Sequence, residues 1–338
     1  MAKERIVSAE YQTGDQSDGA MDLQRTLRPT KLDEFTGQPR LLDRLRIALA
    51  AALERNEPVE HLLLHGPPGL GKTTLAHVVA SEMGSRAYVT SGPAMTKGSD
   101  LVGTLTRMQS GDILFIDEIH RLPAAVEEYI YPAMEDFKID FTLDSGMHAK
   151  VVTYHLKPFT LIGATTRAGL LSGALRSRFG LSHRLDYYET EALESILERA
   201  MQYMGIETMT PDAKVHIAER SRGTPRICLR LLRRVRDFAQ IRNDGCIDAE
   251  VVAGALALEG VDELGLDTLD RAYMQTIMKV YDGGPVGLEA IAATMGEDAS
   301  TLEDLVEPYL LQIGHLARTR QGRQLTGSAR DWLEARPI

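Results

Sequence analysis

The segment Gly66-Pro67-Pro68-Gly69-Leu70-Gly71-Lys72-Thr73 constrains the fold of this sequence more than any other. It matches G-x-x-x-x-G-K-[ST] at every fixed position. The apolar run His61–Leu64 precedes it and predicts a buried strand, and Thr73–Met83 predicts a helix. A glycine-rich loop in this position wraps a phosphate with its backbone N–H groups, and the helix adds its positive N-terminal end. The sequence therefore predicts an α/β domain that binds ATP.

The chemistry of the loop comes from the two side chains that follow its last glycine. Lys72 is expected to bring a positive charge to the β and γ phosphates, and Thr73 to offer its hydroxyl to Mg²⁺. We therefore expect ATP and Mg²⁺ as cofactors. The residues expected to contact ATP in this segment are Gly69, Leu70, Gly71, Lys72, Thr73 and Thr74.

A second motif, Asp117-Glu118, follows the strand predicted over Asp112–Asp117. In open α/β sheets, ligands bind at the carboxyl ends of the strands, where these acids lie. Asp117 is expected to join Thr73 in holding Mg²⁺, and Glu118 to polarise the attacking water as a general base. A water-activating acid favours hydrolysis over transfer to an acceptor, so the motif predicts an ATPase.

Composition sets broader limits. With 338 residues, 43% hydrophobic and 25% charged, the sequence is typical of a globular protein of two or three domains. It has no run of about 18 apolar residues and no signal-like N-terminus, which predicts a cytoplasmic protein without a membrane span. The net charge of −10 argues weakly against nucleic acid as a partner. Tyr309–Arg330 departs from this average, because it has four arginines and no acidic residue.

The chain divides by the type of element that each part predicts. A third strand is expected at Phe159–Ala164, and continuous apolar strands alternating with helices indicate a parallel sheet covered on both faces. Beyond about Tyr187 the pattern becomes helical, and after Gly260–Gly265 it predicts three helices and a hairpin over Leu316–Leu325, the outline of a winged helix. We expect a large ATPase domain over 1–187, a small helical domain over 188–260 and a winged-helix head over 261–338.

The order of these motifs resembles the AAA+ ATPases, and the closer resemblance is to the RuvB family. The residues that carry it are Arg28-Pro29, Phe35-Thr36-Gly37-Gln38, Gly66–Ala76, Asp117-Glu118-Ile119-His120-Arg121-Leu122, Tyr131–Asp136, Ile162–Arg167, Leu175–Phe179, Gly223-Thr224-Pro225-Arg226 and Gly283–Leu288. The resemblance implies an ATP-driven DNA helicase that drives branch migration of Holliday junctions in DNA recombination, DNA repair and the SOS response. It also implies a ring, expected to be a hexamer.

The family also implies roles for particular residues. Thr166 matches sensor 1, and Arg226 matches sensor 2 and is expected to reach the γ-phosphate in cis. Arg178 matches the arginine finger that serves the neighbouring subunit's ATP, with Arg176 as the alternative. With Lys72, Asp117 and Glu118, these residues complete the expected catalytic set. Further ATP contacts are expected from Leu27, Arg28, Glu135, Asp136, Phe137 and Tyr188.

Lys138–Leu156 alternates around Gly146 and predicts a hairpin that projects from the sheet. In the family this hairpin docks RuvA, the junction-binding partner, and a RuvC-type resolvase is a further expected partner. The segment Ser145–Tyr154 departs from the usual family pattern, which is richer in Gly-Pro-Ala and Arg. This departure leaves two possibilities open: the contact with RuvA is altered, or the cognate RuvA has changed to match the hairpin.

The C-terminal hairpin carries the expected DNA contacts. Arg318 and Arg323 are predicted to bind phosphates, with little sequence preference, as a sliding motor requires. Two other functions remain open: a nucleotide-switched DNA-binding regulator without motor action, and a clamp-loader-like assembly factor. Glu118 argues against a pure switch, and the winged head argues against a clamp loader.

Overall fold

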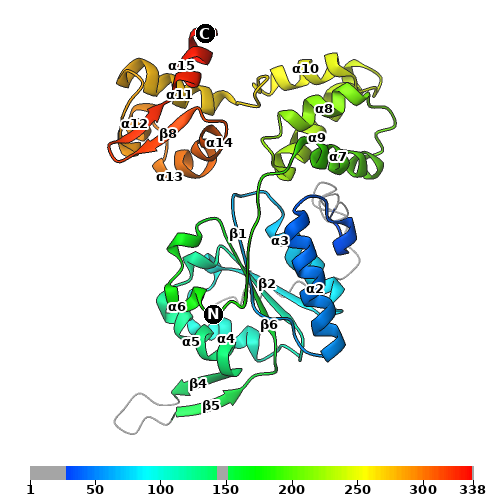
Figure 1. Cartoon of the computed structure of the whole chain (residues 1–338), viewed down its shortest axis with the longest axis vertical. Helices are drawn as coiled ribbons and strands as arrows, with labels where there is room; N and C mark the ends of the chain where they lie inside the picture. Colours follow the sequence, from blue (N-terminus) through cyan, green and yellow to red (C-terminus); the bar gives the residue numbers. More distant parts are fainter. Residues whose placement is uncertain (1–27, 143–150, 337–338) are drawn as a thin grey trace, which may run out of the picture.

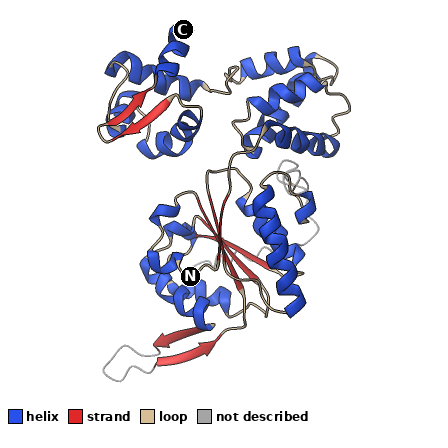
Figure 2. Cartoon of the chain, in the orientation of Figure 1, coloured by secondary structure: helices blue, strands red, loops and turns tan. Residues whose placement is uncertain are grey.

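The computed structural model describes residues 28–142 and 151–336 and divides them into three parts. Figure 1 shows a large α/β domain at the bottom, a group of helices at the upper right and a smaller α/β unit at the upper left. We call these the large domain (residues 28–188), the lid (residues 189–262) and the head (residues 263–336). The predicted fold class is confirmed: a parallel sheet between helices, a helical domain and a winged helix (Figure 2).

The large domain is built on a five-stranded parallel sheet in the order β2-β3-β6-β1-β7. Its strands are β1 (Leu62–His65), β2 (Ala87–Ser91), β3 (Ile113–Asp117), β6 (Thr160–Thr165) and β7 (Leu181–Arg184). The central position of β1 and β3 beside β6 brings the phosphate-binding loop, the acidic motif and Thr166 to the same edge. Parallel pairing therefore assembles the catalytic edge from segments far apart in sequence.

Both faces of this sheet are covered by helices, as the apolar strands predicted. Leu62 and Leu64 pack on one face with α2 and α3, and Leu63 packs on the other with α4 and α5, as the two-residue period of a strand requires. The helices and 3₁₀ turns are η1 (Leu32–Glu34), α2 (Pro39–Arg55), α3 (Lys72–Glu82), η2 (Gly92–Ala94), α4 (Gly98–Leu105), η3 (Ile119–Arg121), α5 (Ala124–Asp136), η4 (Ala168–Leu170) and α6 (Gly173–Arg176).

The hairpin predicted over Lys138–Leu156 is present as β4 (Lys138–Thr142) and β5 (Val151–His155), paired antiparallel. It projects below the large domain in Figure 1. Its base is fixed, because Ile139 is fully buried in the core between the sheet and α5. Residues 143–150 of the predicted tip lie outside the described residues. On β5, Tyr154 is 44% exposed and offers an apolar surface.

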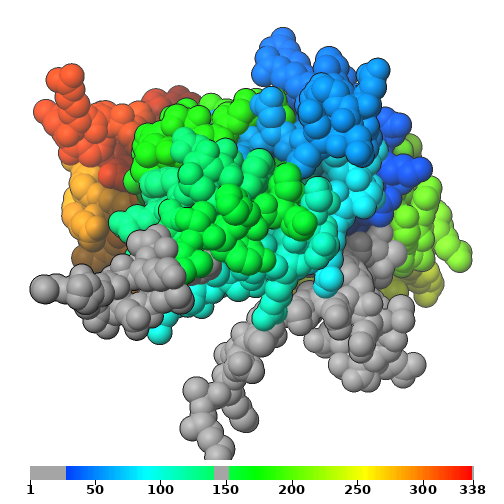
Figure 3. Space-filling model, turned by 90° about the horizontal axis from the view of Figure 1, so that it is seen from below, coloured from blue at the N-terminus to red at the C-terminus, as the bar shows by residue number. Residues whose placement is uncertain are grey.

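The lid and the head are compact units with their own apolar contacts. The lid contains α7 (Thr190–Met204), α8 (Pro211–Glu219), α9 (Pro225–Arg242) and α10 (Ala249–Leu258), and its core continues into that of the large domain. The head contains α11 (Thr268–Tyr281), α12 (Leu288–Met295), α13 (Ala299–Thr301), η5 (Leu302–Val306), α14 (Glu307–Gln312), β8 (Leu316–Thr319), β9 (Gly322–Leu325) and α15 (Gly327–Glu334). Seen from below, the lid and the head appear at opposite edges of the large domain (Figure 3).

One predicted helix of the head differs from expectation. The sequence predicts a continuous helix over Thr301–Leu311, but the structure inserts a π-helical turn, η5, before α14. Pro308 explains the change, because its ring clashes with the carbonyl four residues earlier in a regular α-helix and it has no N–H to donate. A π turn relieves this conflict, and such turns are frequent at functional sites. Within the described residues, no helix is both long and apolar enough to cross a membrane.

Candidate nucleotide site between the large domain and the lid

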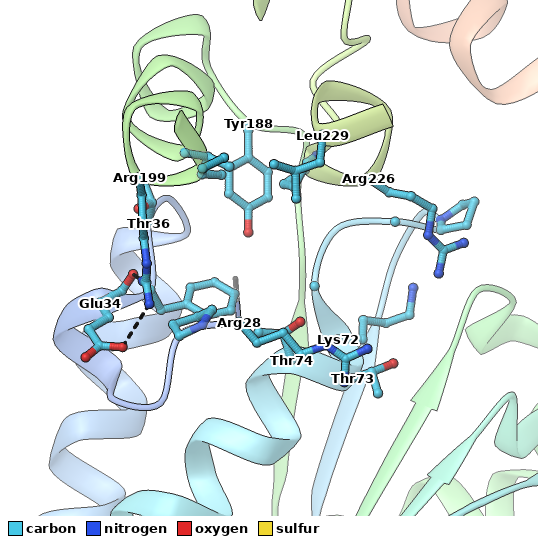
Figure 4. Close-up of a pocket in the computed structure, with 18 of the residues that line it drawn as sticks. Arg28, Glu34, Thr36, Lys72, Thr73, Thr74, Tyr188, Arg199, Arg226 and Leu229 are labelled. Carbon is cyan, nitrogen blue, oxygen red and sulfur yellow. Dashed lines mark hydrogen bonds and ion pairs between the residues drawn. The ribbon is translucent and has the colours of Figure 1, made fainter. Parts of the chain in front are cut away.

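A cavity of about 280 Å³ lies between the catalytic edge of the sheet and the lid. It gathers most of the site residues that the sequence predicted. Those that line it are Arg28, Gly69, Gly71, Lys72, Thr73, Thr74, Asp117, Glu118, Thr166, Tyr188 and Arg226. Figure 4 shows Lys72, Thr73 and Thr74 below this space, with Tyr188 and Arg226 extending toward it from above.

Lys72 lies at the start of α3 and is 7% exposed. Its ammonium donates to the carbonyls of Gly66 and Pro67, both at 2.8 Å, so the loop itself satisfies the buried charge. Burial lowers the pKa of Lys72 to about 8, although Glu118 and Asp117 act in the opposite direction. A buried cation surrounded by loop backbone is well placed to neutralise phosphate oxygens.

Glu118 is held by contacts from the neighbouring strand end. The Thr166 hydroxyl donates to its Oε2 at 3.2 Å, and the Nδ1 atom of His120 lies 3.2 Å from the same oxygen. Glu118 adopts a left-handed backbone (φ 46°), which is uncommon for a residue other than glycine. The surrounding structure therefore fixes this carboxylate at the cavity, as a general base requires.

The lid reaches the phosphate-binding loop through the segment that the sequence assigned to sensor 2. The backbone N–H of Arg226 lies 3.4 Å from the carbonyl of Gly69. A Cβ atom on Gly69 would lie 2.7 Å from the Thr224 side chain, and the φ of Gly69 is +80°. Only glycine fits this position without displacing the lid. The loop and the lid are therefore in direct contact.

The other end of the cavity is formed by Tyr188 and by the segment before α2. Tyr188 is buried, and its hydroxyl donates to the carbonyl of Leu70 at 3.0 Å. Burial raises the pKa of this phenol well above its usual range, so it stays protonated. Leu70 itself is fully buried and contributes its backbone to the loop. Leu27, which the sequence predicted here, lies outside the described residues.

The cavity also contains residues that sequence reasoning missed. Arg199 of α7 pairs with Glu34 of η1 at 3.1 Å and joins the lid to the large domain across the opening (Figure 4). Leu229 and Arg233 line the cavity on the same face of α9 as Arg226. Leu229 follows Arg226 by three residues, and Arg233 follows Leu229 by four, which places all three on one face of a helix. This spacing could have identified both residues once Arg226 was assigned to the site. The pairing of Arg199 with Glu34 had no signal in the sequence.

Some predicted site residues lie away from the cavity. Arg178 binds Glu135 at 3.0 Å, donates to the carbonyl of Ala174 and stacks on Tyr131, with 4.5 Å from guanidinium to ring. Asp136 pairs with Lys138, and Phe137 packs against the ring of Phe159. None of these predicted residues lines the chain's own cavity. The exposed Arg176 does not line it either.

The two arginines predicted to contact DNA face each other across the β8–β9 hairpin. Both bind Glu307, whose side chain is fully buried: Arg318 Nε at 2.6 Å and Arg323 Nε at 2.9 Å. Arg318 remains 43% exposed, but Arg323 only 19%. Arg320 is exposed at the turn between the strands. The acid-free stretch is thus neutralised in part by an acid that precedes it.

Three family models match consecutive parts of the chain. They are described as the "Holliday junction DNA helicase RuvB P-loop domain" (residues 27–185), the "RuvB AAA lid domain" (188–262) and the "RuvB C-terminal winged helix domain" (263–334). The chain belongs to the RuvB family. The resemblance is therefore confirmed, and the chain is a P-loop ATPase.

RuvB relatives match over most of their length. The "Holliday junction branch migration complex subunit RuvB" of Desulfosudis oleivorans is 55% identical, with 90% of this chain and 88% of the relative covered. The subunit of the same name from Salinibacter ruber is 50% identical, with 91% and 89% covered. Among solved structures, the "Thermotoga maritima RuvB Holliday junction branch migration motor" has a TM-score of 0.83 at 48% identity, with 91% of this chain and 98% of that chain covered.

Proposed function

We propose that this chain is an ATP-driven DNA motor that moves the branch point of Holliday junctions during recombination and repair. The observation that carries the proposal is Glu118, a carboxylate fixed at the nucleotide cavity by Thr166 and His120. A protein that only switches with bound nucleotide needs no water-activating acid. The winged-helix head of the same chain would bind DNA. ATP hydrolysis in one part of the chain could then move the DNA that another part holds.

Several residues of the cavity have defined roles in this proposal. The backbone of Gly69 and Gly71 and the ammonium of Lys72 bind the phosphates, and Arg226 approaches them from the lid. Glu118 accepts a proton from the attacking water, and Thr166 keeps its carboxylate oriented. Tyr188 and Arg28 lie at the end of the cavity where the adenine is expected.

The donor set also fits Mg²⁺. The Thr73 hydroxyl and the Asp117 carboxylate both line the cavity, and oxygen atoms are the ligands that this ion prefers. The Asp117 side chain accepts the backbone N–H of Glu118 at 3.0 Å, which orients the carboxylate. When bound, Mg²⁺ would neutralise charge on the β and γ phosphates.

We further propose that neighbouring subunits of a hexameric ring complete each site. Arg178, Glu135, Asp136 and Phe137 are grouped at the end of α5 and after α6, away from the chain's own cavity. A ring would bring this group to the next subunit's ATP, where Arg178 would stabilise charge in the transition state. The stacking on Tyr131 and the ion pair with Glu135 hold the guanidinium in position.

Two surfaces are assigned to other partners. The β4–β5 hairpin (residues 138–156) is the proposed docking site for a RuvA-type protein, and exposed Tyr154 gives it an apolar contact. A RuvC-type resolvase would join the assembled complex. The β8–β9 hairpin is proposed to contact duplex DNA through Arg318 and Arg323. We add Arg320, because it is exposed at the tip.

A strand-displacement assay on a synthetic Holliday junction, with the cognate RuvA present, tests the proposal. Glu118→Gln should bind ATP and DNA but fail to move the branch point. Glu128→Gln, which removes an exposed acid on α5, is the matched control and should retain activity. Full strand movement by Glu118→Gln would refute the role of Glu118, whereas no strand movement by the unsubstituted chain would refute the motor and favour the nucleotide-switched regulator.

A further inference from the structure

Two arginines outside the head bind its acidic residues, and each is close to a nucleotide sensor in sequence. Arg167 directly follows Thr166, and its guanidinium binds Asp304 (Nε at 3.1 Å) and Glu303 (3.0 Å) of the head. Arg222 precedes the sensor segment Gly223–Arg226, and it binds Asp270 and Asp267 of the head. The head therefore contacts both halves of the ATPase.

The Arg222 contact is buried. Arg222 is 8% exposed and Asp270 only 1%, and Arg222 also donates to the carbonyl of Gly265 at 2.7 Å. Its guanidinium stacks on Tyr309 of the head at 5.0 Å. Asp267 and Asp270 also cap the first turn of α11. Opening this contact would break several hydrogen bonds between charged groups at once, together with the packing on Tyr309, which costs more than opening an exposed pair. The head is thus held firmly to the lid.

The Arg167 contact is different, because water reaches it. Arg167 and Glu303 are about one-third exposed (34% and 33%), and Asp304 is 50% exposed. Ion pairs of this kind open at low cost, since water replaces the partner. The head is therefore held to the large domain by a contact that can form and break while the lid contact stays intact.

The releasable contact is connected to the catalytic residues by a short path. The Arg167 backbone N–H donates to the hydroxyl of Thr165 at 3.0 Å. Thr166, which lies between these two residues in sequence, donates its hydroxyl to Glu118. On the head side, the two acids belong to the π-helical turn η5. Glu303 binds Arg167 through Oε2 and lies 3.5 Å from Arg323 of the DNA-facing hairpin through Oε1. One acid thus bridges the sensor segment and the proposed DNA surface.

We propose that Arg167 is a positioning residue whose ion pairs with Glu303 and Asp304 form a latch between head and large domain. The latch couples DNA bound on the β8–β9 hairpin to the orientation of Thr166 and Glu118. Because the head is held to the lid by Arg222, any rotation of the lid against the large domain opens or closes the latch. The coupling of DNA binding to hydrolysis rests on the proposed motor function, whereas the latch itself does not.

The geometry is tested by energy transfer between dyes on the full chain. The exposed Cys246 is replaced by serine, and dyes are placed at Ile47→Cys on α2 (72% exposed) and Val280→Cys on α11 (58% exposed). Asp304→Asn should lower the ratio of latched to open molecules by about two- to fivefold. Asp331→Asn, which removes a head carboxylate with no ion pair among the described residues, should leave it unchanged. An unaltered ratio in Asp304→Asn would overturn the latch, whatever the chain's activity.

The coupling is tested by ATPase rates with and without duplex DNA. Asp304→Asn should keep its DNA-free rate and its DNA affinity within about twofold, while its stimulation by DNA falls by about two- to fivefold. The charge exchange Arg167→Asp with Asp304→Arg should restore most of the stimulation, which a merely structural role would not predict. Unchanged stimulation in Asp304→Asn, or no rescue by the exchange, would overturn the coupling. Lack of DNA stimulation in the unsubstituted chain would instead contradict the motor function, and the energy-transfer result would still decide the latch.

Discussion

The hydroxyl of Thr166 donates to the carboxylate of Glu118 at 3.2 Å, which joins the ends of two adjacent strands, β6 and β3. This bond is the structural basis of the proposed hydrolysis, because a general base must be held in one orientation to act on a single water. The backbone N–H of Thr166 lies 3.4 Å from the same oxygen. The hydroxyl is therefore the stronger of the two contacts.

Removing this hydroxyl should impair hydrolysis without impairing binding. We expect Thr166→Val to lower the ATPase kcat by about tenfold or more, since a hydrogen bond to a charged group contributes about 1.5–3 kcal/mol. ATP affinity should change little, because the phosphates are bound mainly by the loop. Thr104→Val is the control, since among the described residues that hydroxyl bonds only a carbonyl of its own helix. Equal kcat in Thr166→Val and the control would contradict the assigned role.

The lowered pKa of Lys72 predicts that ATP binding depends on pH. The ammonium is needed for phosphate binding, and with a pKa of about 8 the free site loses this charge as the pH rises through 8. Affinity should be constant below about pH 7 and about tenfold weaker at pH 9. Binding measured by titration calorimetry between pH 6.5 and 9 checks this.

Lys72→Arg provides the control for this pH dependence. Its guanidinium stays charged across the same range, so its affinity, although weaker, should not fall above pH 8. A parallel decline in both proteins would assign the effect to another group.

The sequence predicted the centre of the molecule better than its edges. β1, β3 and β6 were found because strands buried on both faces are continuously apolar. β2 and β7 were missed: they form the two edges of the sheet, and their residues Tyr88-Val89-Thr90 and Ser182-His183 are mixed in polarity. The apolar pattern of a strand in the sequence thus reflects how deeply the strand is buried, and it is weak in strands that are only partly buried.

The lining of the cavity was largely predictable, because its motifs are contiguous and lie at strand ends. The contacts of the head were not. The absence of acids from Tyr309–Arg330 predicted a free basic surface, but Glu307 is brought against Arg318 and Arg323 by the fold. Likewise, nothing local to Arg167 indicates that Asp304 is its partner. Contacts between distant segments depend on packing, which a single sequence does not reveal.

The position of Arg178 away from its own cavity predicts that two inactive variants can restore activity together. Arg178→Ala should reduce the ATPase rate by about 10³-fold and Lys72→Ala should abolish ATP binding. In an equal mixture that assembles at random, roughly a quarter of the interfaces carry both an intact Lys72 and an intact Arg178. About that fraction of normal activity should return, measured with DNA present.

A matched experiment decides between the two arginines. Arg176→Ala removes an exposed arginine that does not line the cavity, and it should retain normal activity alone. If Arg176→Ala is inactive and is rescued by Lys72→Ala while Arg178→Ala is active, the finger is Arg176. No rescue at any ratio for either variant would contradict a shared site.

The hairpin arginines should separate into DNA contact and structural support. Arg320→Ala should weaken DNA binding and lower the slope of log affinity against log salt by about one, with no change in the Tm, because the residue is exposed at the turn. Arg323→Ala should also destabilise the head by about 1–3 kcal/mol, since it removes a charge-assisted bond to the buried Glu307. Arg318 would still pair with Glu307 in Arg323→Ala, which keeps the loss within this range. Calorimetric unfolding combined with fluorescence anisotropy on duplex DNA measures both effects, and equal Tm losses for Arg320→Ala and Arg323→Ala would contradict the separation.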